Sequence, residues 1–155
     1  MVINFKAHQA QQAYVAWLCN LPLSVALTLN FRADIHETQA RSAARHFWRL
    51  VDTQVWGANA VKRHNAQLIR VCALEGEAQV RNWHYHAAVQ LPEHWQTNKF
   101  HDLLMNTWGD MREAGKYSMC TAIHDRMGWL NYICKDVRRK GEALCLATSH
   151  IPQPE

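Results

Sequence analysis

The segment "RNWHYHAAVQLP", residues 81–92, is the most informative part of the sequence for the fold. Its short apolar run predicts a β-strand, and alternate side chains of a strand lie on the same face of a sheet. His84 and His86 therefore point to one face, and Tyr85 points to the other, where we expect it to pack. The two histidines are either incidental members of a half-buried strand or two ligands of a metal site, and the surrounding sequence has to distinguish these interpretations.

The segment before this strand supplies a candidate third ligand. "AQLIRVCALEGE", residues 66–77, predicts a strand, and the polar connection to the next strand favours a β-hairpin. In such a hairpin Glu75 and Glu77 return beside His84, and either carboxylate could share the histidine face. Two imidazoles and one carboxylate can hold a divalent cation with open positions for substrate oxygens. The candidate metal ligands are therefore His84, His86 and Glu75, with Glu77 as the alternative carboxylate.

The remaining segments place this hairpin in a larger sheet. Strands are predicted at 23–32, 66–77, 82–91 and 116–125, with a possible short one at 142–150. Helices are predicted within 1–20 and at 37–61, 94–111 and 126–141, the last ended by Gly141. This order predicts an α+β fold, in which helices pack on one face of a central, mainly antiparallel sheet of four to five strands, of ferredoxin-like type. The chain of 155 residues has no repeats and no linker, so we expect one domain, 1–155.

Composition narrows the class of protein. The formal net charge is +4 with ten histidines uncounted, and there are seven tryptophans. Aromatic rings among cations suit single-stranded nucleic acid, although most tryptophans fill cores. The five cysteines form no CxxC pair, as is typical of thiols in a reducing compartment. No apolar run approaches the ~20 residues of a membrane span, and no secretory leader is recognisable, so we expect a cytoplasmic protein without a membrane partner.

The last predicted helix carries a candidate nucleophile. Its core-facing stripe consists of Leu130, Ile133, Cys134 and Val137. Tyr132 and Lys135 lie near the opposite side of the helix. They are either an ordinary surface pair or a catalytic one. A tyrosine hydroxyl beside a cation and a metal-bound phosphate can act as a nucleophile and form a phosphotyrosine intermediate.

Three motifs together resemble one family. "WHYHAAVQLP" resembles the histidine–hydrophobic–histidine motif of the HUH endonucleases, and "NYICKD" resembles the Tyr-x-x-Lys motif of their single-tyrosine replication initiators. "VALTLNFR" is similar to the first-strand motif of the same proteins. The motifs occur in the family's order and span roughly residues 21–137. Each is short and permissive, but their combination, order and spacing are fairly specific. With no recognisable helicase domain, the chain resembles a minimal initiator nuclease of plasmid or filamentous-phage type.

The resemblance implies a fold, an activity and a set of residue roles. It implies a ferredoxin- or RRM-like HUH nuclease fold with the nucleophile helix over the metal face. His84, His86 and, most favourably, Glu75 would hold Mn²⁺ or Mg²⁺. Tyr132 would attack the phosphate of single-stranded or hairpin origin DNA, leaving a 5′-phosphotyrosine and a free 3′-OH, and Lys135 would assist at the phosphate. The activity would be site-specific DNA nicking and rejoining that starts rolling-circle replication.

Three other functions stay open at the level of sequence. A single-tyrosine HUH transposase of an insertion sequence would use the same histidines, although Lys135 and the upstream carboxylate favour an initiator. A non-catalytic nucleic-acid-binding domain would stack bases on tryptophans such as Trp83, Trp95, Trp108 or Trp129. A zinc hydrolase would use water instead of Tyr132. A zinc protease has no support, because "HETQA" at His36 lacks the second histidine of HExxH.

Overall fold

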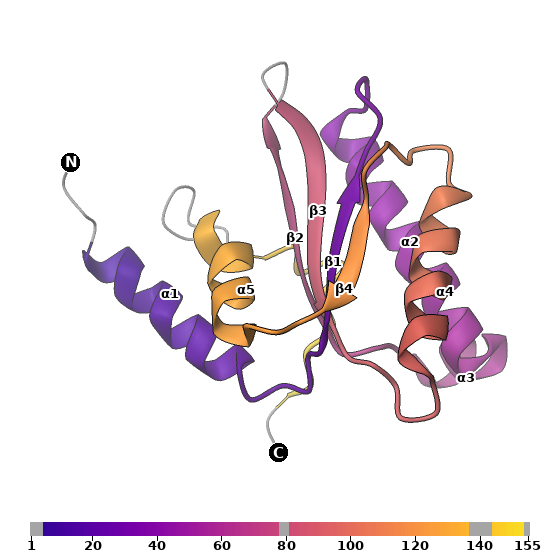
Figure 1. The fold of residues 1–155 in the computed structure, drawn as a ribbon, viewed down its shortest axis with the longest axis horizontal. Helices are drawn as coiled ribbons and strands as arrows, with labels where there is room; N and C mark the ends of the chain where they lie inside the picture. The colour runs from indigo at the N-terminus through magenta and orange to yellow at the C-terminus, as the bar shows by residue number, and fades with distance from the viewer. Residues whose placement is uncertain (1–4, 78–80, 137–143, 154–155) are drawn as a thin grey trace.

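The computed structural model describes residues 5–77, 81–136 and 144–153 (Figure 1). Its four strands are β1 (Val25–Asn30), β2 (Arg70–Glu77), β3 (Arg81–Val89) and β4 (Met119–Ala122). They form one sheet in the order β2-β3-β1-β4, and all three strand pairs are antiparallel. The predicted α+β class with a mainly antiparallel sheet of four to five strands is confirmed.

Within the described ranges, five α-helices and one 3₁₀ turn accompany the sheet. They are α1 (Phe5–Leu18), α2 (Glu37–Trp56), α3 (Ala58–His64), α4 (Thr97–Gly109), α5 (Arg126–Ile133) and the 3₁₀ turn η1 (Cys134–Asp136). The run β1-α2-β2-β3-α4-β4, with α3 appended to α2, is the β-α-β-β-α-β order of a ferredoxin-like fold. None of the helices in the described ranges is long and apolar enough to cross a membrane.

Helices cover both faces of the sheet, where the sequence predicted only one. Figure 1 shows α2 and α4 on one side and α1 and α5 on the other. Strand alternation explains this arrangement, because both faces carry apolar residues. We call the face covered by α1 and α5 the second face. Its strand residues Val71, Ala73 and Ala88 form a separate buried cluster with helix and turn residues, namely Val15, Leu18, Leu130, Ile133 and Cys134. The amphipathic stripe predicted for the last helix therefore packs on the face that carries the histidines.

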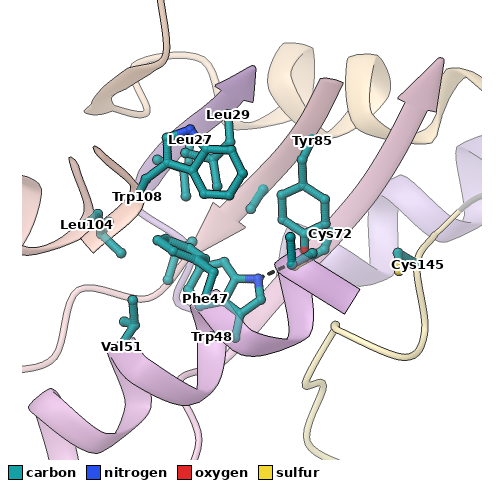
Figure 2. Packing of buried hydrophobic residues seen from close by; sticks show 14 of the residues in the cluster. Leu27, Leu29, Phe47, Trp48, Val51, Cys72, Tyr85, Leu104, Trp108 and Cys145 are labelled. Atoms are coloured by element: carbon teal, nitrogen blue, oxygen red, sulfur yellow. Dashed lines mark hydrogen bonds between the residues drawn. The ribbon is translucent and has the colours of Figure 1, made fainter. Parts of the chain in front are cut away.

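The larger core lies between the sheet and the α2–α4 pair. Phe47, Trp48 and Val51 of α2 pack there with Leu27 and Leu29 of β1 (Figure 2). Tyr85 of β3 is fully buried among them, which confirms its predicted packing role. Its hydroxyl accepts a hydrogen bond from Trp48 Nε1 at 2.8 Å and donates one to Thr148 Oγ1 at 2.7 Å. The polar end of the ring is thus satisfied inside the core, as a buried tyrosine requires.

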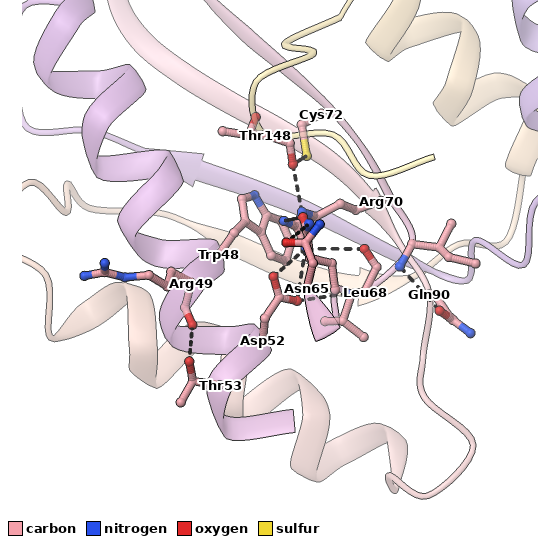
Figure 3. Close-up of polar contacts among 12 residues, drawn as sticks. Trp48, Arg49, Asp52, Thr53, Asn65, Leu68, Arg70, Cys72, Gln90 and Thr148 are labelled. Carbon is pink, nitrogen blue, oxygen red and sulfur yellow. Dashed lines mark hydrogen bonds and ion pairs between the residues drawn. The ribbon is translucent and has the colours of Figure 1, made fainter. Parts of the chain in front are cut away.

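A buried ion pair fastens α2 to the start of β2. Arg70 Nη1 lies 2.9 Å from Asp52 Oδ2, and the two side chains are only 4% and 3% exposed (Figure 3). The guanidinium also covers the ring of Trp48 at 4.6 Å and donates from Nε to the Thr148 carbonyl. Asp52 Oδ1 accepts a further bond from the backbone N–H of Leu68. These contacts join α2, β2 and the segment around Thr148 at one point.

Several predicted element boundaries were wrong. The helix expected over 37–61 ends at Trp56, because Gly57 adopts a φ of +86° that interrupts it before α3 begins. The strand expected over 116–125 is limited to β4, and Tyr117 just before it has a positive φ of 66°. The last helix tightens into the 3₁₀ turn after Ile133, and its expected end at Gly141 lies outside the described residues.

The strand expected at 142–150 is also absent from the described part of that segment, residues 144–150. The backbone turns there, because the N–H groups of Thr148 and Ser149 both bond to the Cys145 carbonyl. It still pairs with the outer edge of β2: His150 forms an isolated antiparallel bridge with Arg70, and the Cys145 N–H donates to the Cys72 carbonyl. This cover protects a sheet edge that would otherwise be open to pairing with another chain.

The buried ion pair generates a first prediction. Asp52→Asn keeps an oxygen for the Leu68 N–H but leaves the Arg70 guanidinium buried without a counter-charge. We expect the free energy of unfolding to fall by about 3 kcal/mol, measured by urea denaturation with tryptophan fluorescence. The control is Asp102→Asn on the exposed side of α4, which should change stability by less than about 0.5 kcal/mol. Equal effects of the two substitutions would contradict this account.

Candidate active site

The register of the β2–β3 hairpin brings a carboxylate to the histidines. Glu75 is paired directly with His84, and residues directly opposite each other in an antiparallel pair share a face. His86 Nε2 lies 3.1 Å from Glu75 Oε2. The rings of His84 and His86 are nearly parallel, with centroids 6.4 Å apart. The structure therefore brings the three predicted ligands His84, His86 and Glu75 together on the second face of the sheet.

The choice between the two glutamates depends on an irregularity in the hairpin. Between Glu75 and Glu77 the β2–β3 register shifts, so that Glu77 is paired with Arg81. Gly76 lies at this shift and allows Trp83 to pack against the backbone, because a Cβ there would be 2.5 Å from Trp83 Cε3. The side chain of Glu77 lies outside the described residues. Glu75 is the carboxylate that contacts the histidine pair.

Two residues of β1, neither of which is predicted from the sequence, orient the histidine rings. His84 Nδ1 lies 2.7 Å from Asn30 Oδ1, and His86 Nδ1 lies 3.1 Å from Thr28 Oγ1. Asn30 Nδ2 donates to the carbonyls of Lys116 and Tyr117, so its oxygen faces His84 and accepts from Nδ1–H. This leaves the lone pair of His84 Nε2 available to a ligand. In the sequence, Thr28 and Asn30 alternate with apolar residues along "VALTLN", which places both on one face of the strand. Only the β1–β3 pairing shows that this face carries the histidines, since Thr28 is paired with His86 and Asn30 with His84.

The short helix α5 brings Tyr132 to the same place. Its N-terminus is capped by Asp125, whose side chain accepts from the Gly128 N–H. Leu130 and Ile133 are buried, whereas Tyr132 is 42% exposed, as the predicted helical stripe requires. The Tyr132 ring meets His86 edge-on at 5.0 Å and stacks on Trp129 at 5.5 Å. Tyr132 therefore lies against the histidine pair and remains open to solvent.

Lys135 connects the tyrosine to the carboxylate. Its Nζ lies 2.7 Å from Glu75 Oε2 and 3.7 Å from the centre of the Tyr132 ring. Partial burial opposes the charge of Lys135, but its contacts with Glu75 and Tyr132 outweigh burial and raise the pKa of the ammonium. Burial likewise opposes the charge of Glu75, but Lys135 and His86 outweigh it and lower the pKa of the carboxyl. Both shifts favour a charged pair at neutral pH.

The donor atoms suit a divalent cation, although they are not gathered into a closed cage. Among the described residues, no group of three histidine, cysteine or acidic side chains is assembled so that it could hold a metal ion as it stands. Glu75 is bonded to both His86 and Lys135. The chemistry of the set, two imidazole nitrogens and one carboxylate, is compatible with a divalent metal.

The buried imidazole of His86 generates a second prediction. Burial lowers the pKa of His86 to about 4, and the nearby Glu75 only partly offsets this effect. The unfolded chain takes up a proton near pH 6.5 and the folded one only near pH 4, so stability is lost as the pH falls through this window. We expect a loss of up to about 3 kcal/mol between pH 7.5 and 4, measured by urea denaturation in the presence of EDTA.

Two variants isolate this effect. His86→Gln removes the buried imidazole and should show a weaker pH dependence of stability between pH 7.5 and 4. His46→Gln, at an exposed position of α2, retains His86 and its neighbours and should keep the wild-type dependence. If His86→Gln and the wild type lose equal stability on acidification, the assignment to His86 is wrong.

Comparison of the chain with protein-family models, with curated proteins and with solved structures finds no match. The chemistry of the site has to be argued from its own side chains. The site brings together the hydroxyl of the half-exposed Tyr132, an ammonium, a carboxylate and two imidazoles. Such a group can neutralise an anionic substrate and present an oxygen nucleophile to it.

Proposed function

We propose that the protein is a metal-dependent, site-specific endonuclease and ligase of single-stranded DNA that starts rolling-circle replication. The observation that carries this proposal is the placement of Tyr132. Its ring lies against His86, and Lys135 lies between that ring and Glu75. Residues that are far apart in the sequence, and that resemble separate motifs of HUH initiators, are thus neighbours on one face of the sheet.

The proposed reaction is a transesterification in which the phosphotyrosine bond replaces a phosphodiester bond. The Tyr132 hydroxyl oxygen attacks the phosphorus, and the bond from phosphorus to the 3′ oxygen breaks. The tyrosine proton is balanced by the proton taken up by the leaving 3′ oxygen, so the products are a 5′-phosphotyrosine and a free 3′-OH. The reverse reaction rejoins the strand, because the energy of the phosphodiester bond is retained in the phosphotyrosine.

The other residues of the site have separate roles in this proposal. His84, His86 and Glu75 would hold Mn²⁺ or Mg²⁺, whose chemistry when bound is to polarise a non-bridging phosphate oxygen. Thr28 and Asn30 orient the two imidazoles. Lys135 lies beside Tyr132 and can neutralise charge that develops on the phosphate during attack.

The competing functions differ in what they require of the described residues. A non-catalytic nucleic-acid-binding domain could not stack bases on Trp108, which is 1% exposed in the larger core. Trp83 and Trp95 also pack against that core. A zinc hydrolase would not need Tyr132. A single-tyrosine transposase would use the same residues for the same bond chemistry, so strand transfer between transposon ends has to be compared with origin nicking.

The third prediction tests the nucleophile. Incubation with a pool of single-stranded oligonucleotides and Mn²⁺ should give a DNA–protein adduct that survives SDS and maps to Tyr132. Tyr132→Phe should abolish the adduct and retain DNA binding, because only the attacking oxygen is removed. The control is Tyr117→Phe, since Tyr117 is 87% exposed and should keep full adduct formation. An adduct that persists in Tyr132→Phe, or none across a diverse pool that includes hairpins, would contradict the proposal.

The fourth prediction tests the orientation of His86. Thr28→Val is nearly isosteric and removes the hydroxyl that lies against His86 Nδ1. Loss of such an outer partner should weaken Mn²⁺ binding about 10-fold, measured by isothermal titration calorimetry. Thr53→Val, at a partly exposed position on α2 whose hydroxyl donates to the Arg49 carbonyl, should leave Mn²⁺ affinity unchanged. Unchanged affinity in Thr28→Val would show that this hydroxyl does not support the ligand.

A further inference from the structure

A pocket of about 420 Å³ lies beside Tyr132, on the side away from Glu75. Its floor is the β1–β4 half of the sheet, where Ala26 is paired with Thr121 and Thr28 with Met119. Its wall is α5 and the loop that leads into it. We refer to it as the β4 pocket. It shares Thr28 and Tyr132 with the candidate active site, so the two are continuous.

The pocket is present because α5 covers only part of this face. Leu130 and Ile133 pack over Val71, Ala73 and Ala88, which belong to β2 and β3. The β1–β4 half receives no such cover: Thr121 is exposed, and Met119 is 62% exposed. The small side chain of Ala26 leaves the space between this floor and α5 open. A larger side chain at position 26 would therefore occupy part of this space.

The wall of the pocket is flat and aromatic. Trp129 and Tyr132 stack with an interplanar angle of 17°, and Trp129 Nε1 donates to the Ala87 carbonyl of β3, which holds its ring in place. His124 and Thr121 provide polar groups among the lining residues. An apolar cavity with an aromatic wall and a few polar groups suits a flat ligand that has a π-face and a polar edge.

We propose that the β4 pocket receives one unpaired base of the DNA strand whose phosphate is presented to Tyr132. The inference rests on the proposed function and adds to it the recognition of a base next to the cleaved phosphate. A nucleotide links a flat base to a phosphate, and the pocket and the nucleophile share the Tyr132 side chain. A base can enter such a pocket only when it is not stacked and paired in a duplex, which favours single-stranded substrate.

The fifth prediction compares two ligands that differ only in their bases. The probes are a fluorescein-labelled random-sequence 30-mer of single-stranded DNA and a 30-mer of abasic phosphodiester backbone with the same charge. Affinities are measured by fluorescence anisotropy in EDTA, so that no cleavage occurs. We expect the wild type to bind the base-containing strand at least about fivefold more tightly than the abasic one, because base–aromatic stacking contributes that much per base.

Filling the pocket should remove much of this preference. Ala26→Leu should weaken binding of the base-containing 30-mer about fivefold and leave binding of the abasic 30-mer unchanged. Ala10→Leu makes the same substitution at an exposed position of α1 and should change neither affinity. Because Ala26 is nearly buried, Thr121→Leu, at an exposed position of the pocket floor, is a second test that disturbs folding less. Circular dichroism confirms that each variant is folded.

The outcomes separate this inference from the proposed function. If the Tyr132 adduct forms but folded Ala26→Leu and Thr121→Leu bind the base-containing strand like the wild type, the pocket inference is wrong and the nuclease stands. If filling the pocket weakens base-dependent binding but no adduct forms on any DNA, the pocket binds a base and the nuclease proposal is wrong. If the wild type does not distinguish the two probes, the pocket inference is overturned.

Discussion

The orientation of β3 is the constraint on which the rest of the structure depends. Tyr85 is fully buried, and its hydroxyl bonds to Trp48 on α2 and to Thr148 in the C-terminal segment. A shift of one residue in the register of β3 would move Tyr85 out of this core and turn both histidines into it, because strand side chains alternate between faces. The burial of Tyr85 thus holds His84 and His86 on the opposite face.

Glu75 is the electrostatic centre of that opposite face. It contacts His86 through one hydrogen bond and Lys135 through an ion pair, and it thereby connects β2, β3 and the end of α5. Its pKa and that of Lys135 shift in the directions that keep both groups charged. The tightening of the chain from α5 into the 3₁₀ turn after Ile133 places Lys135 over the ring of Tyr132.

The unequal cover of the second face divides it into two regions. The apolar residues of α5 pack on the β2–β3 half and place Tyr132 at the border, against His86. The β1–β4 half stays open as the β4 pocket, with Ala26 and Thr28 on its floor. One side of the proposed nucleophile therefore has imidazole and charged groups, and the other has an aromatic cavity. In the proposed function these would take a phosphate and a base, the two parts of one nucleotide.

The sequence by itself determined the order of strands and helices, the common face of His84 and His86, the burial of Tyr85 and the exposure of Tyr132. These features follow from local periodicity, which is a property of the chain alone. Tertiary contacts alone set which carboxylate contacts His86, that Thr28 and Asn30 orient the imidazoles, and how much of the sheet α5 leaves uncovered. These depend on strand pairing, on a register shift at Gly76 and on how far a short helix covers the sheet. Such features arise from contacts between distant segments, which no local pattern encodes.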